Sequence, residues 1–187
     1  MNESKTIEPQ HCTAPVSVRV LTPVDAEAYR AVRLLALNEY PPAFGSLPEE
    51  EPNLQETAAR LTDSDNCCFF GAFQEEQLIG IIRFSRYSAP NEKHRAYIAG
   101  LYVMPAFRRK GCAQALVRSA LQRAANTPGI RRVNLTVVTQ QEAAIRLYQS
   151  LGFSIYGTEQ ETFSLWGYFY DEHLMTLKLN PENDRNA

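Results

Sequence analysis

The chain has 187 residues, of which 44% are hydrophobic and 21% are charged. This length corresponds to one domain of ordinary size, and this balance excludes a disordered, collagen-like or coiled-coil chain. Nineteen Lys and Arg residues against 21 Asp and Glu residues give a net charge of -2, so the chain as a whole has no attraction to nucleic acid or to an acidic membrane.

The two ends of the chain differ in composition from the rest. Residues 1–15 contain charged residues and prolines but no apolar run, so we expect a disordered tail there, without a signal peptide or membrane-spanning segment. Residues 181–187 are polar and are expected to form a second disordered tail. A single domain is therefore expected over residues 16–180.

The cysteines do not indicate a metal site. Their spacing contains no C-x-x-C motif and does not match a set of zinc ligands, and only three histidines are available. We therefore expect no bound metal and free thiols in a reducing, cytoplasmic environment. The four residues are Cys12, Cys67, Cys68 and Cys112.

The first half of the domain predicts one strand, two helices and three further strands. Thr22 suits the cap of a helix and Pro23 suits its first position, so the first helix begins directly after the first strand. Pro41 and Pro42 end this helix, and the acidic residues 49–51 are typical of the start of a second one. The expected elements are a strand at 16–21, helices at 23–39 and 49–61, and strands at 67–73, 78–84 and 95–103.

The second half predicts helices that alternate with strands, followed by a terminal hairpin. Apolar residues recur at helical spacing from Gly111 to residue 126, and Gly152 occupies the usual C-terminal position of the next helix. The expected elements are helices at 111–126 and 140–151 and strands at 132–138, 153–163 and 168–179. Their order predicts an α/β fold, with a mixed, mostly antiparallel, twisted sheet of about seven strands flanked by four helices.

Three consecutive cations lie between a predicted strand and a predicted helix. Arg108, Arg109 and Lys110 precede Gly111, which opens a helix whose first turn leaves backbone N–H groups unpaired. Free N–H donors, the positive end of the helix dipole and basic side chains together suit a phosphate or pyrophosphate, and glycine lets it approach the backbone closely. A solvated basic loop before an ordinary helix fits the same residues.

This stretch resembles the pyrophosphate loop of the GCN5-related N-acetyltransferases (GNAT superfamily), which reads Arg/Gln-x-x-Gly-x-Gly/Ala. Residues 108–113, RRKGCA, fit it, and residues 144–153, AIRLYQSLGF, match the A-x-x-L-Y-x-x-L-G-F segment of the family. The resemblance covers about residues 16–179. It implies the acyl-CoA N-acyltransferase fold, in which the fourth and fifth strands splay apart, and the transfer of acetyl from acetyl-CoA to an amine.

The resemblance also implies which residues bind acetyl-CoA. The end of the fourth strand would pair its backbone with the pantetheine arm, and the basic loop would hold the pyrophosphate on its N–H groups. Many relatives have Asn at the position of Gln141. Gln141 either contacts the pantetheine arm or is an ordinary surface residue, and both alternatives remain open. The residues assigned in this way are Leu101, Tyr102, Val103, Arg108, Arg109, Lys110, Gly111, Cys112, Ala113 and Gln141.

Catalysis by direct attack needs an acid and a base. Tyr148 occupies the position of the usual general acid of the family, and a phenol of pKa about 10 can protonate a departing thiolate whose conjugate pKa is about 8.5; packing of Tyr148 in a helix face is the alternative. Glu39, at the end of the first helix, is the preferred base, and His94 and Asp171 are weaker candidates. Tyr97 stands where some relatives place a catalytic Glu.

The acceptor site is expected between the loop after the first helix and the terminal hairpin. Aromatic and acidic residues there suit a cationic primary amine, of a small molecule in the first place, with a protein N-terminus or lysine as the other acceptor. The assigned residues are Tyr40, Phe44, Tyr97, Tyr168 and Asp171.

Other functions remain open at this point. A non-catalytic acyl-CoA-binding regulatory module would keep the basic loop without turnover, whereas a nucleic-acid-binding module is disfavoured because the basic clusters lack interleaved aromatics. We expect neither a nucleic acid nor a membrane as a partner. The edge of the terminal hairpin would allow a homodimer by sheet extension.

Overall fold

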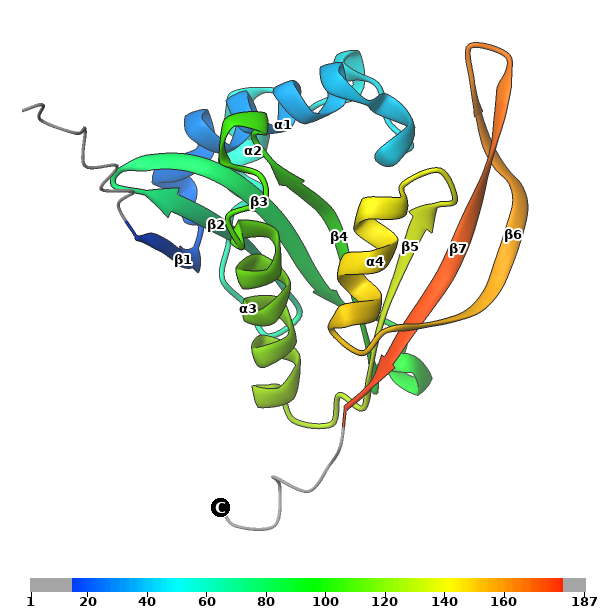
Figure 1. The fold of residues 1–187 in the computed structure, drawn as a ribbon. Coiled ribbons are helices and arrows are strands. Elements are labelled where there is room, and N and C mark those ends of the chain that lie inside the picture. The colour runs from blue at the N-terminus through cyan, green and yellow to red at the C-terminus, as the bar shows by residue number, and fades with distance from the viewer. Residues whose placement is uncertain (1–14, 180–187) are drawn as a thin grey trace, which may run out of the picture.

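Residues 15–179 are described in the computed structural model of the chain, and the expected tails at 1–15 and 181–187 lie outside them apart from Pro15. These residues form one mixed seven-stranded sheet in the order β1-β2-β3-β4-β5-β7-β6 (Figure 1). Only β4 and β5 run parallel to each other, which confirms the predicted fold class. The strands are β1 (Val16–Val20), β2 (Cys67–Gln74), β3 (Gln77–Arg86), β4 (Arg95–Val103), β5 (Arg132–Val138), β6 (Ser154–Leu165) and β7 (Tyr168–Lys178).

Four α-helices cover the two faces of the sheet. They are α1 (Ala26–Glu39), α2 (Leu54–Arg60), α3 (Cys112–Asn126) and α4 (Glu142–Ser150). α3 packs on β2, β3 and β4 from one face, and α1 packs on β3 from the other (Figure 1). Within residues 15–179, no helix is long and apolar enough to cross a membrane.

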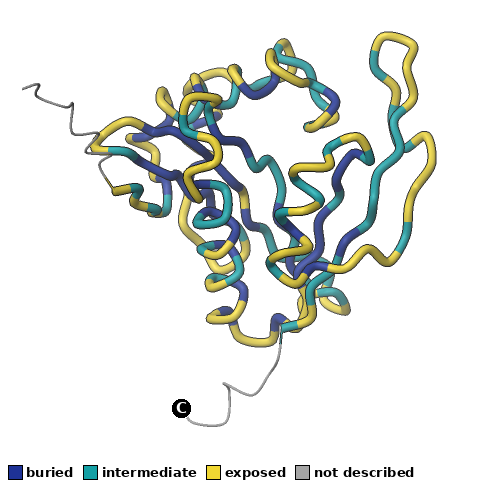
Figure 2. The backbone as a smooth tube through the Cα atoms, viewed as in Figure 1, coloured by how far each residue is buried: buried dark blue, intermediate teal, exposed yellow. Residues whose placement is uncertain are grey.

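Side chains alternate between the two faces of the sheet along each strand, so the sheet has two separate apolar cores. On the α3 face, Leu116 and Val117 pack against Phe84 and its neighbours; on the α1 face, Val32 and Ala36 pack with Phe69 and its neighbours. Figure 2 shows the buried central strands and the exposed outer surfaces of the helices. Each face of the sheet therefore holds its own helices by burial of apolar surface.

The second helix begins later than the sequence predicts. The acidic stretch forms a 3-10 turn at Pro48–Glu50, and Glu51 is extended because it precedes a proline. Helix α2 starts at Leu54, where the Asn53 side chain accepts a hydrogen bond from the Glu56 N–H at 3.0 Å. The first predicted helix likewise begins with a 3-10 turn, Pro23–Asp25, before α1.

Strands β4 and β5 separate soon after they begin. They pair only through Arg95 with Arg132, Ala96 with Val133 and Tyr97 with Asn134. β4 also carries one extra residue against β3 where Gly100 adopts a φ of 65°, a backbone conformation that glycine adopts without strain. The splayed strands implied by the family resemblance are therefore present.

The hairpin of β6 and β7 forms one edge of the sheet and extends away from the helices (Figure 1). Its tip exposes three aromatic side chains, Trp166, Tyr168 and Phe169, with exposures of 65%, 69% and 63%. The strand edge of β6 is unpaired within the described residues. A homodimer through this edge stays a prediction.

Candidate active site

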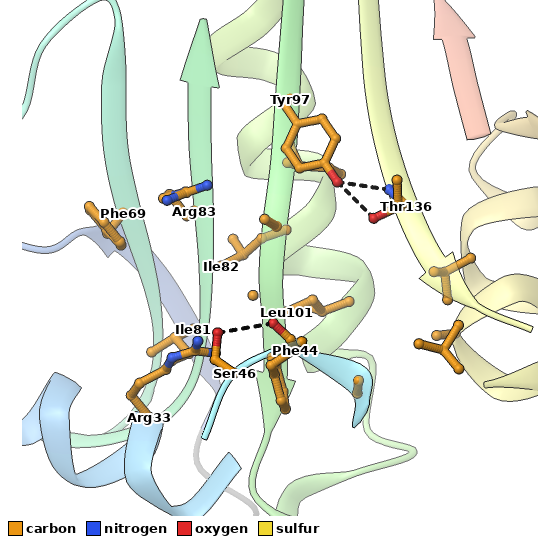
Figure 3. Close-up of a pocket in the computed structure, with 18 of the residues that line it drawn as sticks. Arg33, Phe44, Ser46, Phe69, Ile81, Ile82, Arg83, Tyr97, Leu101 and Thr136 are labelled. Carbon is orange, nitrogen blue, oxygen red and sulfur yellow. Dashed lines mark hydrogen bonds between the residues drawn. The ribbon is translucent and has the colours of Figure 1, made fainter. Parts of the chain in front are cut away.

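A cavity of about 840 Å³ occupies the opening between β4 and β5. It extends over the face of β3 that carries Arg83, and reaches the loop after α1 at Phe44. Figure 3 shows these side chains around the cavity, with Tyr97 on β4 facing Thr136 on β5. Residues from six segments line the opening itself, namely Tyr97–Leu101, Thr136–Val138, Gln141, Tyr148, Phe163 and Glu172.

Tyr97 bridges the gap between the two strands. Its hydroxyl accepts a hydrogen bond from the Thr136 N–H at 3.1 Å, and it lies 2.8 Å from Thr136 Oγ1. The phenol thus binds an amide group that has no partner on β4. Burial raises the pKa of Tyr97, so this phenol stays neutral at physiological pH.

Glu172 completes this hydrogen-bonded chain. The Thr136 hydroxyl donates to Glu172 Oε1 at 3.1 Å, so Tyr97, Thr136 and Glu172 lie in a row across β4, β5 and β7. Burial raises the pKa of Glu172, the Thr136 hydrogen bond opposes this, and Glu159 on β6 adds to the rise. A carboxylate with a raised pKa in a cavity is a stronger base than an exposed one.

Tyr148 enters the opening from α4. It is 8% exposed and packs edge-on against Phe153, with ring centres 5.8 Å apart. Burial, with a smaller contribution from Tyr97, raises the pKa of Tyr148 above the ordinary value, so its hydroxyl keeps its proton. Among residues 15–179, no hydrogen-bond partner is found for this hydroxyl, which leaves it available to a bound molecule.

The basic loop before α3 has the geometry of an anion site. Arg109 and Gly111 have positive φ angles of 62° and 82°, and the first helical hydrogen bond runs from the Ala115 N–H to the Gly111 carbonyl at 2.9 Å. The N–H groups before Ala115 therefore point out of the helix end, where the dipole is positive. The Cys112 thiol turns inward and contacts the Phe107 carbonyl at 3.4 Å.

Arg108 and Glu39 are paired with each other. Arg108 donates to both carboxylate oxygens of Glu39, at 2.7 and 2.8 Å, and to the Val103 carbonyl at 2.8 Å. Glu39 also accepts from the Tyr102 hydroxyl at 2.7 Å, and the Arg108 guanidinium lowers the pKa of Glu39. The Arg108 side chain is thus engaged within the protein, and the Glu39 carboxylate is a weakened base outside the cavity lining.

The residues expected at the acceptor site separate into two groups. Phe44 and Tyr97 line the cavity, whereas Tyr40, Tyr168 and Asp171 do not. Asp171 accepts a hydrogen bond from the Glu161 N–H at 2.9 Å instead. Successive residues of a strand face opposite sides of a sheet, so the next residue, Glu172, faces the cavity in place of Asp171.

Sequence reasoning also missed several cavity residues. A charged residue inside the apolar strand at 78–84 was a usable signal for Arg83. Glu51 and Glu172 belong to two acidic stretches of the sequence, at 49–51 and 171–172, but the sequence does not show which carboxylate of each stretch faces the cavity. Arg33, Arg60 and Thr136 come from positions that carried no motif, and only the tertiary structure brings them into the cavity.

Comparisons with known proteins show the family and the fold of the chain. The model of the family described as "Acetyltransferase (GNAT) family" matches residues 30–153, a segment that contains both sides of the β4–β5 opening and the basic loop. A solved structure of yncA from Salmonella typhimurium, a putative acetyltransferase with its cofactor acetyl-CoA, has a TM-score of 0.77 at 20% identity and covers 89% of this chain and 95% of that one.

Of three curated relatives, two have names that state an acceptor, and these two acceptors differ. Human N-acetyltransferase 8 is 37% identical over 100 residues, 53% of this chain and 43% of that protein, so the chain matches less than half of that relative's length. The spermine/spermidine N(1)-acetyltransferase of Bacillus subtilis is 24% identical over 56% of this chain and 72% of its own. The L-amino acid N-acetyltransferase AaaT of Escherichia coli is 24% identical over 83% and 95%.

Tyr97→Phe tests the bridge across the opening. Removal of the phenol leaves the Thr136 N–H without its acceptor, which is expected to lower the free energy of unfolding by about 1–3 kcal/mol in urea denaturation. The matched control is Tyr156→Phe, at a side chain that is 59% exposed, which should leave stability unchanged. Equal stability of the two variants would contradict a structural role for the Tyr97 hydroxyl.

Proposed function

Because this chain belongs to the acetyltransferase (GNAT) family, whose members use acetyl-CoA, we propose that it transfers acetyl from acetyl-CoA to the primary amine of a small molecule. The observation that carries the proposal is the opening between β4 and β5, which holds Tyr148 and Glu172 in one cavity. The anion site before α3 supplies the second requirement, a place for the pyrophosphate of the CoA.

Each part of acetyl-CoA has a matching place in this arrangement. The segment of β4 after Tyr97 is unpaired toward β5, so its backbone groups are available to the pantetheine arm. Arg109 and Lys110 are exposed beside the N–H groups at the start of α3 and provide the positive charge for the pyrophosphate. Arg108 instead holds the end of α1 to the end of β4 through Glu39.

The chemistry needs positioning more than charged groups. The neutral amine nitrogen attacks the thioester carbonyl carbon, the C–S bond breaks, and the CoA thiolate leaves with a proton. A cavity that holds both reactants in line supplies much of the rate enhancement without a covalent enzyme intermediate. The buried Cys112 thiol faces the Phe107 carbonyl, so it takes no part.

The acid and the base approach from opposite faces of the sheet. Tyr148 belongs to the core on the α3 face and donates its proton to the thiolate. Glu172 lies in the row with Tyr97 and accepts the proton that the amine loses. The raised pKa of each group suits its role, because Tyr148 stays protonated and Glu172 becomes the better base.

Binding of acetyl-CoA is tested by thermal unfolding. At 100 times its Kd, acetyl-CoA adds ~2.7 kcal/mol, a rise of about 5–10 °C in Tm for a chain of this size. Gly111→Val should abolish the rise, because the side chain enters the space of the pyrophosphate. The matched control is Gly167→Val, because Gly167 and Gly111 have nearly the same φ, 83° and 82°, and at neither position would an added Cβ meet a non-neighbouring atom within 4 Å. A rise that survives Gly111→Val would contradict the assigned loop.

Tyr148→Phe tests the acid. The ring packing on Phe153 is kept, so acetyl-CoA should raise Tm as in the wild type, while kcat falls by about 10²–10⁴. Tyr156→Phe is the control and should leave kcat unchanged. An unchanged kcat in Tyr148→Phe would rule out the acid role, and a wild type that binds acetyl-CoA but acetylates no amine would be the non-catalytic acyl-CoA-binding module.

Glu172→Gln tests the base through the pH dependence of kcat/KM. Below the amine pKa, log kcat/KM falls by one unit per pH unit, and below the raised pKa of Glu172 the slope should increase to two. Glu172→Gln should lower kcat/KM by about 10²–10⁴ and remove this second break. Glu39→Gln should keep the second break, because Glu39 is paired with Arg108. Loss of the second break in Glu39→Gln would favour Glu39 as the base.

A further inference from the structure

The cavity contains more positive than negative charge. Three arginines, Arg33, Arg60 and Arg83, line it against two carboxylates, Glu51 and Glu172. Arg33 is 3.3 Å from Glu51 and its guanidinium lies 4.8 Å from the centre of the Phe44 ring, so both members of this pair are engaged. Within the described residues, neither the Arg60 nor the Arg83 side chain has an ion pair or a hydrogen bond.

Arg83 is an exposed residue in the middle of β3. It lies on β3, inside the sheet, with Ile82 and Phe84 on either side buried at 1% and 0% exposure. In the register of the strands it faces Phe69 on β2 and Ala99 on β4, and Figure 3 shows it on the cavity face of β3 near Phe69. The Arg83 guanidinium is exposed on the cavity face of β3, so an anionic group of a molecule bound in the cavity can reach it.

Among residues 15–179, no carboxylate forms an ion pair with Arg83. Two titratable groups that interact with Arg83 are the Tyr29 phenol and the Cys67 thiol. Burial raises the pKa of Tyr29 to about 12 and also raises the pKa of Cys67, so both groups are neutral at physiological pH. The positive charge of Arg83 is therefore open to a bound molecule.

The distance from Arg83 to the opening sets the size of that molecule. Arg83 pairs with Ala99, and Tyr97 is the next residue of β4 on the same face, so Arg83 and Tyr97 are diagonal neighbours. Such neighbours are about 7–8 Å apart. The arginine side chain shortens this distance further. A molecule that places its amine at the opening and its anionic group on Arg83 therefore has only a few bonds between the two groups.

We propose that the acceptor carries a carboxylate close to its amine, as an amino acid does, and that Arg83 determines this specificity by binding the carboxylate. The inference rests on the proposed function. A guanidinium binds a carboxylate through two parallel hydrogen bonds, which fixes the orientation of the acceptor as well as its affinity. The amine then points to the opening, toward Glu172, while Arg60 adds a second positive charge on the carboxylate side.

The same charges select against polyamines. When one amine of a polyamine lies at the opening, its next ammonium group meets Arg83 and Arg60 without an anion between them. Like charges at close range are repulsive, and repulsion of the wrong ligand is an effective source of specificity. The proposal therefore favours a zwitterionic acceptor over the cationic one that the aromatic and acidic residues of the sequence suggest.

The experiment compares acceptors that differ only at the carboxylate. Acetyl transfer is measured for the twenty amino acids, for their α-carboxamides and for spermidine. The best amino acid is expected to exceed its own amide and spermidine in kcat/KM by at least about 10-fold. An amide or spermidine that is acetylated as well as the best amino acid would overturn the proposal.

Variants assign the effect to Arg83. Arg83→Gln is expected to lower kcat/KM for the amino acid by about 10- to 100-fold, mainly through KM, and to leave the amide within about twofold. Arg83→Lys should recover part of the loss, because the charge stays but the paired hydrogen bonds do not. The control is Arg118→Gln, on the exposed surface of α3, which should change nothing. An equal fall for amino acid and amide would overturn the role of Arg83.

Failure of this inference is distinct from failure of the proposed function. If acetyl-CoA raises Tm and an amine without a carboxylate is the best acceptor, the acetyltransferase stands and the carboxylate site is wrong. If acetyl-CoA does not raise Tm and no acceptor is acetylated, the proposed function itself is wrong, and the carboxylate site with it.

Discussion

The separation of β4 and β5 is the constraint on which the rest of the structure depends. Parallel strands are ordinarily buried on both faces and paired along their length, whereas this pair joins through three residue pairs and then opens. Opening a sheet leaves backbone donors and acceptors without partners, which costs free energy in a buried position. Tyr97 offsets part of that cost by binding the Thr136 N–H, and the extra residue at Gly100 redirects the end of β4.

Because the sheet opens, groups from its two faces meet in one cavity. Tyr148 comes from the core beneath α4 and Glu172 from the opposite face of β7, and an unbroken sheet would keep them apart. Burial in the opening favours the uncharged form of both groups, so it raises the pKa of Tyr148 and the pKa of Glu172. One structural feature thus brings together Tyr148 and Glu172, the proposed acid and base, and raises the pKa of both.

Local features of the site could be predicted from the sequence, and features that depend on distant pairing could not. The loop at 108–113 was predictable because its chemistry lies in consecutive residues: a glycine, a helix start and neighbouring cations. The pairing of Arg108 with Glu39 joins residues 69 positions apart and has no local pattern. The choice between Asp171 and Glu172 depends on which face of β7 meets the opening, and hence on the register of β5 with β7.

The distribution of charge in the cavity follows from the same topology. β3 brings Arg83 to one side of the opening and β7 brings Glu172 to the other, while the Arg33–Glu51 pair beside them is internally neutral. A molecule that carries opposite charges at its two ends has one favourable orientation in such a field, and that orientation directs its amine toward the opening. Productive attack needs the amine nitrogen in line with the thioester carbon, so the charges that we propose as the source of acceptor selectivity would also orient the acceptor for reaction.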